Sequence, residues 1–150
     1  MSSGDFQSIV EYAITLEQKS SDNYKKLSEQ VTAPEIKKVF LELSAQEIGH
    51  KKKLESIEAK GNLPASKNIH PDDDLKISDY IVEIDSSKPD LSYAEALALG
   101  MQMEDASLKL YRSLATRVED PELIELFNYL AKEEAKHKHS FESEFDDLMG

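Results

Sequence analysis

The sequence of 150 residues contains no cysteine and only five glycines and five prolines. The lack of cysteine excludes disulfide bonds, iron–sulfur clusters, thiolate zinc sites and cysteine nucleophiles. The small share of glycine and proline argues against a disordered chain or a fibrous repeat. We expect a single domain over residues 1–150, which is long enough to enclose its own core.

Basic residues are few, since 18 lysines and arginines stand against 30 acidic residues and give a net charge of −12. Such a surface repels nucleic acids and anionic membranes, so we expect neither as a partner. The sequence has no apolar run that could span a bilayer, and its N-terminus does not resemble a secretion signal. We therefore expect a soluble cytoplasmic protein whose acidic character is compatible with collecting cations.

The chain repeats itself after 87 residues. Residues 5–58 align with residues 92–145 without a gap, and 14 of the 54 aligned pairs are identical. Unrelated sequences would share about three. Identical pairs include Glu17 with Glu104, Tyr24 with Tyr111, Pro34 with Pro121, Phe40 with Phe127, Leu43 with Leu130, Glu47 with Glu134, and His50 with His137. The sequence is therefore a duplicated unit.

Each unit reads as two amphipathic helices, because its inward-type residues recur at alternating spacings of three and four. The pattern covers residues 10–31 and 36–57 in the first unit, and 97–118 and 123–141 in the second. Four helices of about 25 residues, each about 38 Å long, form a four-helix bundle. The predicted fold class is all-α, with two duplicated helical hairpins.

Start and stop signals set the approximate limits of these helices. Residues 32–35 and 92–95 each read as a capping box, and residues 120–121 place a cap before a first-turn proline. Glycine and asparagine at 61–62 end the second helix. The predicted helical hairpins therefore span about 5–61 and 92–148.

The linker of residues 62–91 is longer than a turn between neighbouring helices requires. Thirty extended residues reach about 100 Å, so this linker can cross the whole bundle. Its length favours an overhand crossover over a simple up-and-down topology. Residues 75–84 have isoleucines at helical spacing and are predicted to pack as a short helix, with three aspartates at 72–74 near its N-terminus.

Six ionisable residues stand where the helical pattern demands apolar side chains. They are Glu17, Glu47, His50, Glu104, Glu134 and His137. At 1.5 Å per residue, Glu17 lies about 21 Å before the turn that follows it and Glu47 about 18 Å after the same turn. The second unit repeats both distances, so all four helices bring these residues to one layer.

One glutamate from each of two helices and a Glu-x-x-His pair from each of the other two form the ligand set of di-iron and di-manganese bundles. Four carboxylates supply hard oxygen ligands and offset two divalent cations, and two imidazoles suit iron or manganese. Two glutamates can bridge the metals while two bind terminally. Without a cation, four packed carboxylates would repel one another, which argues against a bare structural bundle.

Two tyrosines are candidates for tuning such a site. Tyr24 and Tyr111 lie seven residues after Glu17 and Glu104, on the same helix faces. They can donate a hydrogen bond to a ligand carboxylate, or they can simply be aromatic core residues. Both interpretations fit the spacing.

The ordered set of motifs resembles the rubrerythrin family of the ferritin-like superfamily over almost the whole chain. The motifs are Glu17 with Tyr24, Glu47-x-x-His50, Glu104 with Tyr111, and Glu134-x-x-His137. The resemblance implies a ferritin-like bundle with two iron ions that react with oxygen or hydrogen peroxide. It also implies that the six ionisable residues are the metal ligands, with no catalytic residue beyond them. Manganese or a mixed metal pair fits the same ligands.

Two features depart from the pattern of that family. Rubrerythrins proper have a C-terminal rubredoxin domain that feeds electrons to the di-iron centre through a four-cysteine iron site, whereas this sequence has no cysteine. We therefore expect an external electron donor, for example a rubredoxin-like protein. Rubrerythrins also have an extra carboxylate one turn after the third-helix ligand, where this sequence has Ser107. That difference argues against peroxide reduction.

These features lead to two functional hypotheses. The first is a non-haem di-iron oxidoreductase of the ferroxidase or peroxidase type, a homodimer that serves oxidative-stress defence or iron handling. The second is an iron-binding or iron-storage protein without dedicated redox turnover. Storage needs a large hollow shell, so oligomer size separates the two.

Overall fold

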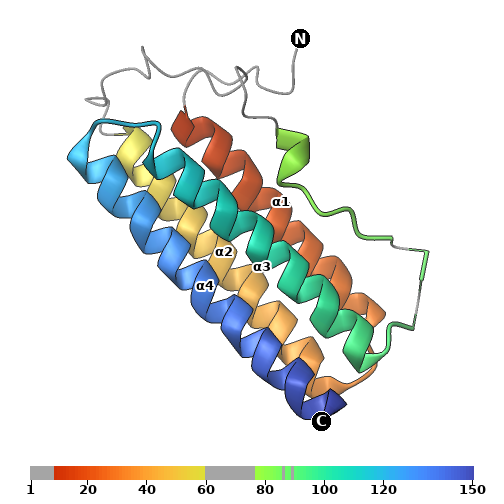
Figure 1. The fold of residues 1–150 in the computed structure, drawn as a ribbon. Coiled ribbons are helices and arrows are strands. Elements are labelled where there is room, and N and C mark those ends of the chain that lie inside the picture. Colours follow the sequence, from red (N-terminus) through yellow and green to blue (C-terminus); the bar gives the residue numbers. More distant parts are fainter. Residues whose placement is uncertain (1–8, 60–76, 86, 89) are drawn as a thin grey trace.

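A computed structural model describes residues 9–59, 77–85, 87–88 and 90–150. These residues form four α-helices and one short 3-10 helix, and they contain no extended β-strand. The elements are α1 (Ile9–Gln30), α2 (Pro34–Ala59), η1 (Ile77–Asp79), α3 (Tyr93–Ala115) and α4 (Pro121–Met149). The helices pack side by side (Figure 1), which confirms the predicted ferritin-like four-helix bundle.

The two hairpins run α1 down, α2 back, α3 in the direction of α2, and α4 back again (Figure 1). The linker returns to the end of α1 before α3 begins, because the N–H of Leu91 donates to the carbonyl of Gln30 at 2.9 Å. Val31 and Leu91 form an isolated parallel bridge at the same point. The predicted crossover is therefore confirmed for the described part of the linker.

The described part of the linker follows α1 from one end of the bundle to the other. Tyr80 and Ile81 pack against the apolar cluster that contains Ile9, whereas Ile84 belongs to the cluster that contains Val31. The linker therefore covers the face between α1 and α3.

The predicted short helix over residues 75–84 is wrong beyond one turn, since only Ile77–Asp79 is helical among its described residues. An extended chain advances about 3.3 Å per residue against 1.5 Å in a helix, so extension suits a segment that must travel the bundle. The other signals predicted at 61–62 and 72–74 lie outside the described residues.

Side-chain amides of α1 replace the hydrogen bonds that a linker helix would have made. Nδ2 of Asn23 donates to the carbonyl of Val82 at 2.9 Å. Nε2 of Gln30 donates to the carbonyls of Asp85 and Lys88 at 2.7 and 2.8 Å. Backbone polar groups of the extended linker are thereby satisfied without helical structure.

The predicted helix starts are confirmed in part. Ser92 caps α3, and it exchanges both hydrogen bonds of a capping box with Glu95. Asp120 is the cap residue of α4, but its side chain makes no capping hydrogen bond. α2 begins at Pro34, so Ala33 precedes it and Thr32 lies one residue too early for the predicted capping box.

The apolar core has two clusters, one on each side of the ionisable layer. One cluster combines the beginning of α1, the end of α2, the end of α3 and the beginning of α4. The other combines the opposite ends of the same helices, including Tyr24, Phe40, Leu97 and Phe141. Each cluster thus holds one end of the layer in place by packing.

Candidate metal centre

Six ionisable side chains meet between the two core clusters. They are Glu17 of α1, Glu47 and His50 of α2, Glu104 of α3, and Glu134 and His137 of α4. All are buried except His137, whose side chain is 15% exposed. Each residue continues the inward-facing stripe of its helix, so the docking of the two hairpins brings the six side chains predicted from the sequence together.

These side chains form two groups, each with potential metal-binding atoms within 4.8 Å of one another. The members are Glu17, Glu47, His50 and Glu134 in one group, and Glu104, Glu134 and His137 in the other. Glu134 belongs to both groups. Its carboxylate therefore lies between two places where a cation could bind.

Both histidines turn Nδ1 toward the carboxylates. Nδ1 of His50 lies 3.2 Å from Oε1 of Glu47 and 3.3 Å from Oε1 of Glu134. Nδ1 of His137 lies 3.4 Å from Oε2 of Glu104. Neither nitrogen makes a hydrogen bond within the described residues, so each is available as a ligand atom.

Seven buried polar atoms of this cluster find no hydrogen-bond partner among the described residues. They are Oε1 of Glu17, Glu47 and Glu104, both carboxylate oxygens of Glu134, and Nδ1 of both histidines. A buried polar atom without a partner costs about 1–3 kcal/mol, so such atoms are rare in folded proteins. Carboxylate oxygens and imidazole nitrogens are ligands for iron and manganese, and the set therefore fits a pair of divalent cations.

The two tyrosines connect the hairpins through the glutamates of the first helix of each unit. Tyr24 of α1 donates to Oε2 of Glu104 on α3 at 2.5 Å, and Tyr111 of α3 donates to Oε2 of Glu17 on α1. Both rings are also buried in the core clusters. Both interpretations of these tyrosines therefore apply at once, because each is a core residue that also donates a hydrogen bond to a carboxylate.

Burial makes the metal-free cluster hold protons. Burial and the neighbouring carboxylates raise the pKa values of Glu47 and Glu104 well above the usual range. Burial alone would lower the pKa of His50, but the carboxylates around it outweigh that effect and raise this pKa to about 12. The arrangement concentrates negative charge that only protons or cations can neutralise.

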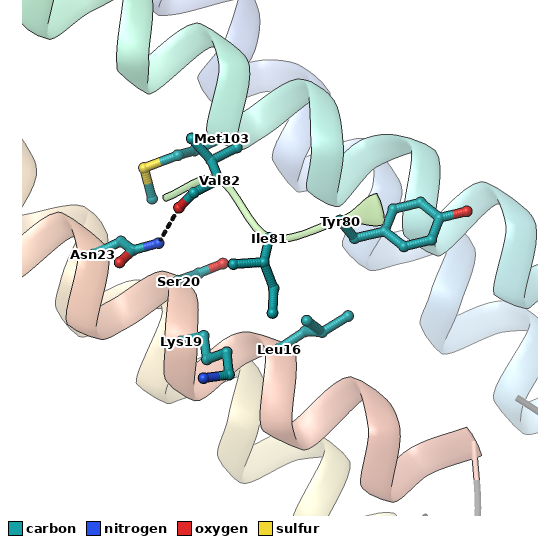
Figure 2. Close-up of a pocket in the computed structure, with 8 residues that line it drawn as sticks. All are labelled: Leu16, Lys19, Ser20, Asn23, Tyr80, Ile81, Val82 and Met103. Atoms are coloured by element: carbon teal, nitrogen blue, oxygen red, sulfur yellow. Dashed lines mark hydrogen bonds between the residues drawn. The ribbon is translucent and has the colours of Figure 1, made fainter. Parts of the chain in front are cut away.

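The linker closes the site on the side of α1 and α3. Figure 2 shows Ile81 and Val82 of the linker lying over Ser20 and Asn23 of α1, with Met103 of α3 beside them. The cavity left there measures about 10 Å³, which is room for about one water molecule. This face therefore excludes all but the smallest molecules.

Serine follows each of Glu17 and Glu104 by one helical turn. Ser107 is half-buried one turn after Glu104, and its counterpart Ser20 lines the small cavity under the linker. The layer therefore retains four glutamates and two histidines. The sequence-based interpretation did not identify the glutamate partners of the two tyrosines, which lie 80 and 94 residues away along the chain.

A four-helix bundle with a buried layer of carboxylates and imidazoles defines the ferritin-like class of proteins. The family model described as Rubrerythrin matches residues 8–145. The chain therefore belongs to the rubrerythrin family.

Comparison with solved structures gives the same fold. A hypothetical protein from Pyrococcus furiosus superposes with a TM-score of 0.69 at 22% sequence identity, over 95% of this chain and 89% of that one. A search among curated proteins gives no match. Among the described helices, none combines the length and apolar character that crossing a membrane requires.

Proposed function

We propose that this protein is a non-haem di-iron oxidoreductase that acts on oxygen or hydrogen peroxide, with Glu17, Glu47, His50, Glu104, Glu134 and His137 as its metal ligands. One observation carries the proposal. Seven polar atoms of these residues are buried without hydrogen-bond partners in the described structure, and they face one another between the core clusters. Such a layer is unfavourable in a bundle unless cations occupy it.

The glutamates of the layer would hold the two metals in different ways. Tyr111 and Tyr24 each donate a hydrogen bond to Oε2 of a glutamate on the opposite hairpin, and Oε1 of Glu17 and of Glu104 has no hydrogen-bond partner among the described residues, so these two glutamates would serve as terminal ligands. Glu134 belongs to both groups and both its oxygens lack partners, which suits a bridging carboxylate.

When bound, two iron ions would supply electrons to the oxidant by cycling between the ferrous and ferric states. The protein would orient their ligands and shield the layer from water on one face and at both ends, since the linker covers the face between α1 and α3 and the core clusters cover the two ends. An external electron donor, for example a rubredoxin-like protein, would return the electrons, and a homodimer would be the working assembly. Manganese or a mixed pair is the alternative metal content.

The test is metal stoichiometry after anaerobic loading with Fe(II), followed by oxygen and by hydrogen peroxide in separate runs. We expect two irons per chain, oxidised during the reaction, and the faster oxidant identifies the substrate. A chain that retains neither iron nor manganese would overturn the proposal. An iron core or a large cage would instead favour the second candidate function, iron storage.

Two pairs of variants test the ligand assignment. Glu47→Ala and His137→Ala should sharply lower the number of bound metals while circular dichroism still shows a helical bundle. Glu133→Ala and His139→Ala are the matched controls, because Glu133 pairs with Lys136 and His139 is exposed. Unchanged stoichiometry in Glu47→Ala and His137→Ala would refute the assignment.

A further inference from the structure

A groove of about 510 Å³ opens between α2 and α4, on the side of the bundle that the described linker leaves uncovered. Its volume lies in the range of sites that enclose small organic molecules, which is about 300–1,000 Å³. The contrast with the cavity of about 10 Å³ under the linker is large. Access to the ionisable layer is therefore asymmetric.

The walls of the groove are apolar, and its exposed polar rim has two glutamates together with His139, Ser140 and Ser143. Ile36 and Leu43 of α2, Leu97 of α3 and Phe141 of α4 line the interior. Glu35 and Glu144 stand at the exposed rim, where the carboxylate of Glu144 accepts a hydrogen bond from the hydroxyl of Tyr93 at 3.2 Å. Apolar walls favour an apolar body, and two rim carboxylates oppose an anion.

The groove reaches the ionisable layer at His137. This histidine lines the groove, and it is the one member of the six-residue layer that is not fully buried. His50, its counterpart in the first hairpin, is buried. The groove thus connects solvent to one specific edge of the layer.

A glycine on α3 provides part of the space. A Cβ atom at Gly100 would lie 2.8–3.0 Å from three ring atoms of Phe141, so the missing side chain lets that ring lie against the α3 backbone. Phe141 is buried there although it lines the groove. A larger residue at position 100 would push the ring toward the cavity.

We propose that the groove between α2 and α4 is a binding site for a small organic molecule with an apolar body and neutral or positive charge, held with one end beside His137. The volume, the apolar walls, the two rim glutamates and the opening at His137 carry this assignment. The proximity of the bound molecule to metal rests on the function proposed above, whereas binding in the groove does not.

Two dyes with one carbon skeleton test both the site and its charge preference. N-phenyl-1-naphthylamine is neutral, and 8-anilino-1-naphthalenesulfonate adds a sulfonate; both fluoresce strongly in apolar surroundings. We expect the neutral dye to bind the metal-free full chain at one per chain, and the anionic dye to bind about tenfold more weakly or worse. No binding of the neutral dye, or equal affinity of the two, would overturn the proposal.

Two tryptophan substitutions on α2 locate the binding. Val39 lines the groove and is 39% exposed, whereas Leu41 is 47% exposed and lies outside the groove. Val39→Trp should weaken binding of the neutral dye about tenfold, because its ring fills the groove, while Leu41→Trp should change it by less than about twofold. Equal effects of the two variants would refute the location.

Two further measurements separate this proposal from other outcomes. Metal stoichiometry of Val39→Trp should equal that of the unmodified chain, so a failure of metal binding and a failure of dye binding are distinguishable. Sedimentation should give the same oligomeric state with and without saturating dye. Dissociation of an oligomer by the dye would show that the groove is an interface between copies of the chain, and would overturn the proposal.

Discussion

At the scale of single residues, the central feature is that the two oxygens of each tyrosine-bound glutamate differ in their hydrogen bonding. Tyr111 holds Oε2 of Glu17 and Tyr24 holds Oε2 of Glu104, and in both cases Oε1 is left without a partner. A hydrogen bond to one oxygen of a ligand carboxylate fixes the orientation of the whole carboxylate. Each hairpin therefore orients a ligand of the other.

Tyr111→Phe should weaken metal binding by about 10- to 100-fold, as is typical when a group that orients a ligand is removed. The ring remains in its buried place, so the bundle should stay folded. Competition with a chelator of known affinity measures the change. Tyr129→Phe is the control because Tyr129 is exposed on α4, and equal affinities of the two variants would contradict the role of Tyr111.

Glu47→Gln should stabilise the metal-free chain by about 1 kcal/mol while it lowers metal binding. Burial and the charges of Glu17 and Glu134 disfavour the ionised form of Glu47, and a neutral amide of the same shape removes that cost. Urea unfolding of the metal-free variant and of the unmodified chain gives the comparison. A less stable variant would show that the contact with His50 outweighs the repulsion.

At the scale of the elements, the two hairpins are alike in pattern but differ in their helix contacts. Ser21 of α1 and Ser44 of α2 exchange hydrogen bonds, each hydroxyl donating to the carbonyl of the other residue at 2.9 Å. The duplicated positions in the second hairpin are Leu108 and Ala131, which pack in the apolar core. The same helical pair is therefore held by polar contacts in one unit and by apolar contacts in the other.

Glycine-to-alanine changes in two helices should have opposite effects. Within the described residues, no atom outside the adjoining α2 backbone lies within 4 Å of a Cβ placed at Gly49, so Gly49→Ala should stabilise the chain by about 0.8 kcal/mol through helix propensity. Gly100→Ala should lose that gain and cost about 1–3 kcal/mol, because the new methyl group collides with the Phe141 ring. Thermal and urea unfolding measure both, and a stabilised Gly100→Ala would contradict the packing argument.

At the scale of the whole molecule, the linker makes two similar hairpins into an asymmetric protein. It covers the face between α1 and α3 (Figure 1), whereas the groove lies between α2 and α4. Gln30 is one anchor of the linker, since its buried amide donates to two linker carbonyls. The position of the described linker therefore depends in part on this side chain.

Gln30→Ala should increase hydrogen exchange across residues 80–91, because the carbonyls of Asp85 and Lys88 lose their shared donor. The expected loss of stability is about 1–2 kcal/mol. Exchange followed by mass spectrometry measures the local effect. Gln46→Ala, at an exposed site on α2, should leave exchange in the linker unchanged. Equal protection of the linker in both variants would show that Gln30 is not its anchor.

Metal binding should stabilise the whole bundle, because the layer joins all four helices. At a free metal concentration of 100 times the Kd, the free energy of unfolding should rise by about 2.7 kcal/mol. Thermal unfolding with Fe(II) under anaerobic conditions, or with Mn(II), gives the shift. The Glu47→Ala variant should show little of it. If neither metal changes the unfolding temperature, the layer does not bind metal and the protein is a structural bundle only.

The helices, the duplication and the level of the ionisable layer could all be predicted from the amino-acid sequence. These features follow from the period and rise of the α-helix, which are local properties, so that Glu17 and Glu47 could be placed at one height by counting residues. The helix ends depend on local signals as well, and the observed ends lie close to the predicted ones; α2, for example, begins at Pro34.

The way in which the two hairpins pack against each other could not be predicted from the sequence, and three features depend on this packing. Tyr24 and Glu104 are partners because α1 faces α3 across the layer, and their separation by 80 residues leaves no local signal. The linker is extended where its isoleucine spacing predicted a helix, because amides of α1 satisfy its carbonyls. The groove beside His137 is formed by residues of α2, α3 and α4, which only the packing of the two hairpins brings together.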